Sequence, residues 1–336
     1  MFLEKNAPPL IIDEVQYAPG IMRYLKVKID EDREKNGQFL LTGSQKFSLM
    51  SGITKSLPGR FSLGTLHSLS LLELKKWMKT EIKGKLLLEV ILKGGYPELY
   101  AKDLSPELFY GDYLSTCLER DVRQIINVKN LRTFNLFIKL LATRSGQLLS
   151  MNSLASEVGV STQTIKSWIN VLETSNIIYL LKPFFRNIGK RLVKAPKLYF
   201  LDTGLLLYLL GIKTTKELES SSLLGNIFET LVLGQIIRNL ENKGIKPDLY
   251  FYRDHYGHEV DFVIPVGEKL KLFEAKWSSS NSEQIKGFVE IEKLLGEDKI
   301  LSRTIITSQP GFYKTKENLF FSDPVDLRCQ VWEIFF

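Results

Sequence analysis

Two acids and a lysine lie close together in the segment 259–277, EVDFVIPVGEKLKLFEAKW. Gly267 and Glu268 at its centre predict a two-residue hairpin turn of type II′, which takes glycine in its first position. In the register of that turn, Asp261 faces Glu274 and Glu259 faces Lys276, all on the same side of the ladder. The expected apolar side of the hairpin consists of Val260, Phe262, Phe273 and Ala275, and the charged side also carries Val263 and Leu272.

This arrangement of residues indicates a hydrolytic metal site. Two carboxylates that face each other repel unless a proton or a cation lies between them. Mg²⁺ accepts a few carboxylate ligands and keeps several waters, so we expect Asp261 and Glu274 to be metal ligands. Lys276 could then stabilise the attacking water and the developing negative charge. The alternative is a polar sheet face on which Lys276 bridges the two acids, and the residues leave it open.

The spacing D-x12-E-x-K resembles the core of the PD-(D/E)xK nucleases. Glu229, in the helical segment GNIFETL, resembles the additional helical acid of resolvase-like members. This resemblance implies that Glu229 joins Asp261, Glu274 and Lys276 as a catalytic residue and shares in binding Mg²⁺. The reaction that it implies is metal-assisted hydrolysis of a phosphodiester.

A second pattern, upstream of the hairpin, is typical of a DNA-binding helix-turn-helix. The segment 150–184 reads as a helix, a tight turn at Gly159, a second helix and then a hairpin, and Ser161 can cap the second helix. In that second helix Ile165, Trp168, Ile169 and Leu172 form an apolar stripe, which leaves the other side for DNA. The segment 182–197 that follows is rich in Lys and Arg and contains no acid. We expect Gln163, Lys166, Lys190 and Arg191 to contact DNA, with a small helical domain and a solvated face as the alternative.

A third pattern, at the N-terminal end, resembles half of an ATPase site. The apolar strand LII is followed by Asp13 and Glu14, as in a Walker B motif, where the aspartate holds Mg²⁺ and the glutamate polarises water. A second strand ends in LTGS, which predicts Thr42 or Ser44 beside the γ-phosphate. Arg60 could stabilise charge. An acid pair after a strand is also common as a helix cap.

Taken together, the motifs resemble the AAA-type ATPases of archaea and bacteria that carry a C-terminal domain of unknown function. The segments that carry this resemblance run through nearly the whole chain: LIIDEVQYAPG, FLLTGSQKF, SLPGRF, LSLLEL, GGYPELY, YLSTCLERDV, PKLYFLDTGLL, GNIFETLV, GHEVDFVI and FEAKWS. The family's P-loop, G-x-x-x-x-G-K-[ST], is not found in the 336 residues. We therefore expect the N-terminal part to be a partial ATPase domain that binds ATP poorly and does not hydrolyse it alone. A P-loop supplied by a separate chain is left open.

Composition sets wider bounds. The formal charge of +7 fits a polyanion such as DNA, although many proteins that bind no polyanion have such a charge. Two cysteines without ligand spacing argue against a disulfide framework or a zinc site and for a reducing compartment. The start of the chain has no signal-peptide pattern, and the longest apolar run is too short for a bilayer. We expect a cytoplasmic protein without a membrane partner.

The expected architecture is a multidomain α/β protein. It consists of a truncated AAA-type ATPase domain with a parallel sheet (1–75), a helical lid or linker (76–138), a winged helix-turn-helix (139–195) and a PD-(D/E)xK nuclease-like α/β domain (196–336). Residues 61–70 are expected to form a third strand of the ATPase sheet. Two functional alternatives to a DNA-cleaving protein remain. One is a non-catalytic DNA-binding or regulatory protein, and the other is an inactive relic that self-associates through an exposed sheet edge.

Overall fold

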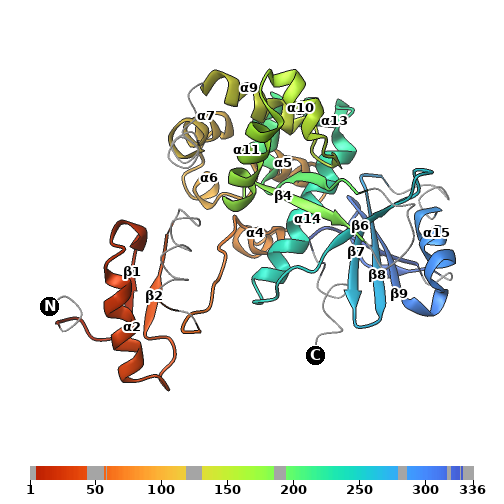
Figure 1. Ribbon diagram of the computed structural model, residues 1–336. Coiled ribbons are helices and arrows are strands. Elements are labelled where there is room, and N and C mark those ends of the chain that lie inside the picture. The colour runs from red at the N-terminus through yellow and green to blue at the C-terminus, as the bar shows by residue number, and fades with distance from the viewer. Residues whose placement is uncertain are drawn as a thin grey trace. The chain divides into compact units, whose positions relative to one another are not determined.

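A computed structural model describes residues 5–43, 57, 59–118, 131–184, 194–278, 286–315, 319–325 and 327. These residues form two compact units, 1–64 and 65–336, and each unit is considered by itself (Figure 1). None of the described helices is long and apolar enough to cross a membrane.

The first unit contains the parallel strands expected of the ATPase-like segment. β1 (Leu10–Ile12) pairs in parallel with β2 (Phe39–Leu41), and a short 3₁₀ helix (Val15–Tyr17) and α2 (Ile21–Glu31) connect them. Val15, Met22, Leu25 and Leu57 form its small buried core. The predicted parallel pairing is therefore confirmed for these two strands.

The third strand expected at 61–70 was wrong. Residues 61–70 form no strand, and Leu63 and Leu66 are exposed. Alternating apolar residues stabilise a strand only where a neighbouring strand accepts their hydrogen bonds. Here the segment contains the boundary between the two units, after residue 64, and the amide of Leu69 donates to the carbonyl of Gly95 within the second unit.

Short helices begin the second unit, and a buried aspartate ties them to the rest of it. The helices are α4 (Leu71–Met78), α5 (Lys85–Lys93), α6 (Pro97–Ala101), α7 (Pro106–Asp112), a π-helix (Tyr113–Leu118) and α9 (Leu131–Ala142). Asp202 caps α12 (Thr203–Leu210) through the amide of Leu205. Its carboxylate also accepts from the Tyr110 hydroxyl (2.7 Å), the Gly95 amide (2.9 Å) and the Ser68 hydroxyl (3.1 Å). One side chain thus joins three separate segments.

The helix-turn-helix elements form where the sequence places them. α10 (Met151–Val158) ends at Gly159 with a left-handed φ of 76°, and α11 (Thr162–Thr174) begins after Ser161, whose hydroxyl accepts from the Thr164 amide at 3.1 Å. The predicted apolar stripe is buried, and Trp168 packs edge-on against Phe134 of α9. β4 (Ile178–Pro183) and β5 (Lys197–Phe200) follow as an antiparallel pair.

A nine-stranded mixed sheet runs through the second unit in the order β10-β11-β9-β8-β7-β6-β4-β5-β3. Its remaining strands are β3 (Gln147–Leu148), β6 (Tyr250–Arg253), β7 (Glu259–Val266), β8 (Lys269–Lys276), β9 (Ile300–Thr307), β10 (Tyr313–Lys314) and β11 (Leu319–Ser322). α14 (Leu224–Glu241) covers one side of the β7–β8 hairpin and α15 (Lys286–Leu295) the other (Figure 1). A further short helix, α13 (Thr215–Ser220), precedes α14.

One hydrophobic core extends from α4 through the helix-turn-helix to α14 and β8, and a second lies between the sheet and α15. The predicted boundaries after residues 75, 138 and 195 all fall within the second unit and stay predictions.

Candidate functional site: a buried cluster of carboxylates and lysines

The predicted hairpin forms, and its register is the predicted one from the pair Phe262–Phe273 to the pair Val266–Lys269. β7 and β8 are antiparallel, Phe262 pairs with Phe273, and Val263 pairs with Leu272. Gly267 adopts a left-handed φ of 59°, as the first position of a type II′ turn requires. The turn chemistry alone was therefore sufficient to place the two strands.

The strict alternation expected along β7 is wrong next to Asp261. On the neighbouring strand β6, Tyr250 pairs with Val263 and Tyr252 with Val260, so β7 holds one more residue than β6 over this stretch. Such a bulge changes the direction of side chains. Val260 and Val263 consequently pack together in the α15-side core, whereas Phe262 packs in the core that includes α14.

Asp261, Glu274 and Lys276 converge as the spacing predicted. Asp261 and Glu274 are both buried, and the Lys276 ammonium lies 3.0 Å from a Glu274 oxygen and 3.8 Å from Asp261 Oδ2. Asp261 Oδ2 also accepts a hydrogen bond of 2.9 Å from the Ala275 amide. The side chain of Lys276 is 38% exposed, so a molecule in solvent can reach this group.

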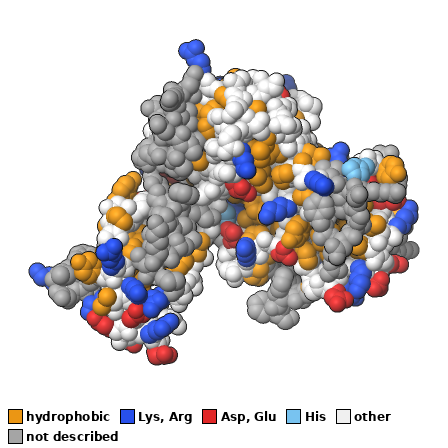
Figure 2. Space-filling view, in the orientation of Figure 1, with side chains coloured by type: hydrophobic (Ala, Val, Ile, Leu, Met, Phe, Trp, Pro, Cys, Tyr) orange, Lys and Arg blue, Asp and Glu red, His pale blue; other side chains and the backbone are white. Residues whose placement is uncertain are grey.

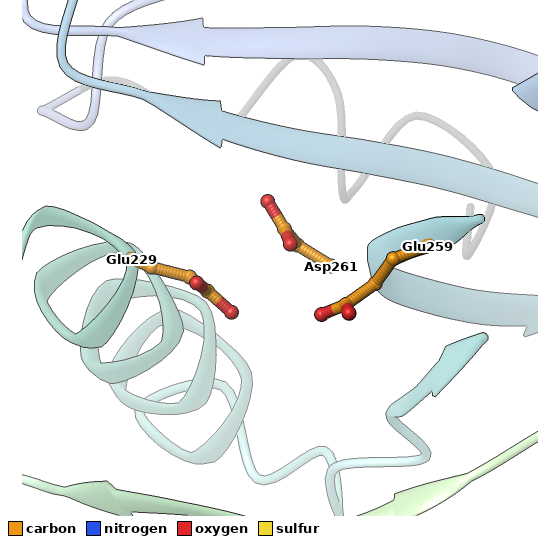
Figure 3. Close-up of side chains that lie close together, drawn as sticks. All are labelled: Glu229, Glu259 and Asp261. Carbon is orange, nitrogen blue, oxygen red and sulfur yellow. The ribbon is translucent and has the colours of Figure 1, made fainter. Parts of the chain in front are cut away.

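Asp261 also belongs to a second group of three neighbouring carboxylates, which lies on the side away from Lys276. Glu229 reaches in from α14, and Glu259 and Asp261 come from β7 (Figure 3). One oxygen from each lies within 4.8 Å of the others. The ammonium of Lys197, at the start of β5, contacts all three: it lies 2.6 Å from Glu229, 3.8 Å from Asp261, and donates to Glu259. The acids and lysines thus form one cluster with two halves that share Asp261. One half contains Glu229, Glu259 and Lys197, and the other contains Glu274 and Lys276.

The charges shift the pKa values of the acids in opposite directions. Burial, followed by the negative charge of Asp261, raises the pKa of Glu229 to about 7 and that of Glu274 well above its usual range. Burial would also raise the pKa of Asp261, but the charges of Lys276 and Lys197 and hydrogen bonds from Glu274 and Ala275 outweigh it and lower the pKa. Asp261 is thus the stronger acid of the pair and Glu274 the weaker one.

Both lysines remain charged. Burial disfavours the charged form of Lys197, but Glu229 and the neighbouring acids outweigh burial and raise its pKa well above the usual range. Asp261 and Glu274 likewise raise the pKa of Lys276 against the effect of burial.

The two halves differ in how well they fit a divalent metal. Burial and the charge of Asp261 raise the pKa of Glu274, so these two carboxyl groups can hold a proton between them, in the place that a cation can take. These two acids therefore fit Mg²⁺ once that proton leaves. In the other half, the Lys197 ammonium already occupies the oxygens of Glu229 and Glu259, so this set does not fit a metal as it stands. The predicted metal role of Glu229 stays a prediction.

Lys197 and Glu259 are members of the cluster that the sequence did not reveal as site residues. Lys197 is only 2% exposed, whereas its place at the end of a basic segment had suggested a solvated side chain. The one local signal is the pattern Lys-x-Tyr in KLYF, because alternate residues of a strand share a face. Tyr199 indeed donates to Glu229 as Lys197 does. Glu259 also pairs with Arg253 at 2.9 Å.

The residues predicted to contact DNA are only in part described. Gln163 and Lys166 are exposed on α11, opposite its buried stripe. Lys190 and Arg191 lie outside the described residues. On the face seen in Figure 2, Lys and Arg side chains are interspersed with Asp and Glu, so no continuous positive patch marks a DNA interface among the described residues on that face.

The residues predicted to bind nucleotide are partly brought together within the first unit. Thr42 donates to the Asp13 carboxylate and accepts from the Glu14 amide at 3.2 Å, at the ends of the parallel strands. Arg60 instead pairs with Asp30, with contacts of 2.7 and 3.1 Å. Ser44 lies outside the described residues.

Three family descriptions match successive parts of the chain. Residues 1–75 match an AAA domain, residues 84–216 match a domain of unknown function (DUF8612), and residues 224–322 match another (DUF4143). These matches support an AAA-type family with domains of unknown function. They agree with the resemblance seen in the sequence at this level of detail.

Curated relatives are similar over most of this chain. Uncharacterized proteins of Mycobacterium bovis and Mycobacterium tuberculosis are each 30% identical over 275 residues, which is 81% of this chain and 59% of theirs. An uncharacterized protein of Haemophilus influenzae is 27% identical over 218 residues, or 60% of this chain and 52% of its own length. The chain thus spans less than two thirds of the length of these relatives.

Proposed function

We propose that this AAA-type chain acts on DNA, and that it hydrolyses phosphodiester bonds with a divalent metal held by Asp261 and Glu274. The observation that carries the proposal is the convergence of these two buried carboxyl groups with the ammonium of Lys276. Glu229, from a different element, reaches the same cluster. This combination of two buried acids and a lysine suits the hydrolysis of a charged ester better than it suits a structural role, because burying two neighbouring acids costs folding free energy.

The residues of the chain have distinct roles in this proposal. Asp261 and Glu274 would hold Mg²⁺, which would supply positive charge and lower the pKa of a water molecule. Lys276 is partly exposed and lies 3.0 Å from Glu274, so its ammonium can face a phosphate group in solvent. The Ala275 amide fixes the orientation of Asp261. Because the pKa of Glu274 is raised, its carboxyl group would have to release its proton to solvent before it could hold the ion together with Asp261.

DNA contact is assigned to α11. Its buried stripe fixes the helix against α9, and Gln163 and Lys166 point away from that core. A helix presented in this way after a tight turn is the arrangement that enters a major groove. Apart from the buried Lys197, the Lys- and Arg-rich segment 182–197 adds phosphate contacts, for which Lys190 and Arg191 are proposed.

The deciding experiment is a titration of Mg²⁺ and Mn²⁺ on labelled duplex and branched DNA. Wild type should cleave in a metal-dependent manner, and Glu274→Ala should lose cleavage while it still binds DNA. Glu219→Ala, an exposed acid on α13, is the matched control and should cleave as wild type does. Cleavage that survives Glu274→Ala would refute this site.

A second candidate, a non-catalytic DNA-binding protein, is favoured by one observation. With Glu274 neutral, the acids Glu229, Glu259 and Asp261 face the cations Lys197, Lys276 and Arg253, so the cluster can be balanced without metal. Salt-dependent DNA binding by wild type, with no cleavage at any metal concentration, would select this candidate.

We also propose that the first unit binds a nucleotide, because residues 1–75 match an AAA domain. Asp13 and Thr42 lie at the ends of the two parallel strands, where nucleotides bind in open α/β sheets. The purified 336-residue chain is still expected not to turn over ATP. Turnover that is lost in Asp13→Ala would contradict this expectation, whereas turnover only on addition of a second chain would support a P-loop supplied from elsewhere.

A further inference from the structure

Lys197 has an unusual position for a lysine. Its side chain is 3% exposed, and its ammonium contacts Glu229, Glu259 and Asp261 at once. These partners come from two elements, α14 and β7, and Lys197 comes from a third, β5. The three hydrogens of an ammonium group match three surrounding carboxylates.

The contacts of Lys197 are the contacts of a bound cation. One oxygen from each of its three partners lies within 4.8 Å of the others, which is a spacing that a single ion can bridge. Without a cation, three neighbouring carboxylates in a buried place would repel one another strongly. The ammonium of Lys197 also lies near two aromatic rings, 5.7 Å from the centre of the Tyr199 ring and 5.9 Å from that of Phe251.

We infer that Lys197 is a built-in cation that closes the Glu229–Glu259–Asp261 half of the cluster to divalent metal. The open half is then Asp261 with Glu274, and the site takes one metal ion where the full set of acids could take two. The inference deepens the proposed function because it fixes how many ions the site binds. It rests on the proposed function only for the ion held by Asp261 and Glu274.

Counting Mn²⁺ tests the inference directly. Removal of the ammonium in Lys197→Met leaves the three acids in place with an apolar chain of similar length. Lys197→Met should bind one more Mn²⁺ per chain than wild type when free Mn²⁺ is counted by electron paramagnetic resonance. Saturating Mn²⁺ should also raise the Tm of Lys197→Met by about 5 °C or more, because ligand binding stabilises the folded state.

Two variants serve as controls. Lys216→Met replaces an exposed lysine on α13 and should bind the same number of ions as wild type. Lys197→Met combined with Glu229→Gln removes one cation and one acid, and should fold without metal and lose the additional ion. An equal Mn²⁺ count in wild type and Lys197→Met would overturn the inference.

Failure of Lys197→Met to fold is also informative. If the single variant folds only in the presence of Mn²⁺, the metal replaces the ammonium and the inference holds. If it stays unfolded with Mn²⁺, whether or not the double variant folds, a divalent ion cannot replace Lys197 and the inference is wrong.

The outcome is separable from that of the proposed nuclease activity. The measured quantity is the difference in bound Mn²⁺ between Lys197→Met and wild type, and no cleavage enters it. A wild type that binds no Mn²⁺ and cleaves no DNA would refute the proposed function. A difference of one ion would still support the role of Lys197.

Discussion

The carboxylate of Asp261 accepts a hydrogen bond of 2.9 Å from the backbone amide of Ala275 on the adjacent strand. This contact holds one oxygen of Asp261 towards β8, near Lys276, while the other lies 3.8 Å from Lys197. Asp261 is therefore the residue on which both halves of the cluster depend. Glu274, by contrast, is neutral and interacts with only one half.

This difference predicts unequal costs for two isosteric substitutions. Asp261→Asn removes a negative charge between two ammonium groups and should lower the free energy of unfolding by about 3–5 kcal/mol. Glu274→Gln replaces a neutral acid by a neutral amide and should cost less than about 1 kcal/mol. Urea denaturation at pH 7 with a metal chelator measures both, and equal losses would mean that the assignment of the ionised acid is wrong.

The raised pKa of Glu229 predicts a dependence of stability on pH. Burial and the charge of Asp261 raise this pKa from 4.5 to about 7, so the folded chain holds the proton more tightly than the unfolded chain. The resulting stabilisation is fully present below about pH 4.5 and is lost as the pH rises through about 7. It amounts to roughly 3 kcal/mol.

Glu229→Gln should remove that part of the pH dependence. Denaturation of wild type and variant is compared between pH 4.5 and 8 without metal, and only the difference is assigned to Glu229, because Glu274 titrates in the same sense. Parallel curves for the two proteins would exclude the raised pKa.

Substitutions on α11 should change the salt dependence of DNA binding. Lys166→Ala removes one proposed phosphate contact and should lower the slope of log affinity against log salt by about 1. Gln163→Ala should weaken binding with an unchanged slope, because its side chain carries no charge. Lys216→Ala provides the control, and an unchanged slope for Lys166→Ala would remove this lysine from the DNA interface.

The buried contacts of Asp202 predict a large loss of stability away from the cluster. Asp202→Ala leaves the Gly95 and Leu205 amides without their side-chain acceptor and Arg238 nearby without its counter-charge, while the Tyr110 hydroxyl keeps only the Lys93 carbonyl as acceptor. We expect a loss of about 3–5 kcal/mol in chemical denaturation. Asp202→Asn should cost less, because its amide oxygen can still cap α12. The reverse order would show that the capping contact is unimportant.

Local patterns allowed much of this architecture to be predicted. The type II′ turn at Gly267 placed Asp261, Glu274 and Lys276 together, and the capping residue Ser161 located the start of α11. Both are decided by residues close in sequence. The stretch 61–70 failed for the opposite reason, since a strand also needs a partner that its own sequence does not specify.

The position of Lys197 could not be predicted because its partners are distant in sequence. Glu229 is 32 residues away and Glu259 is 62 residues away, and both meet Lys197 only when β5, α14 and β7 pack together. The bulge in β7 is likewise fixed by pairing with β6. A sequence pattern can indicate an acid, but the identity of its counter-ion depends on the assembled sheet.

The strand β4 pairs with β5 in antiparallel and with β6 in parallel orientation. The strand β4, which follows α11, thereby belongs to the same sheet as β7 and β8, which carry the acids, with β6 between β4 and β7. A DNA duplex bound to α11, as proposed, would consequently lie at a fixed distance and angle from Asp261. If α11 binds DNA and the cluster cleaves it, as proposed, the geometry of the sheet would set the distance along the DNA between the bound site and the cleaved bond.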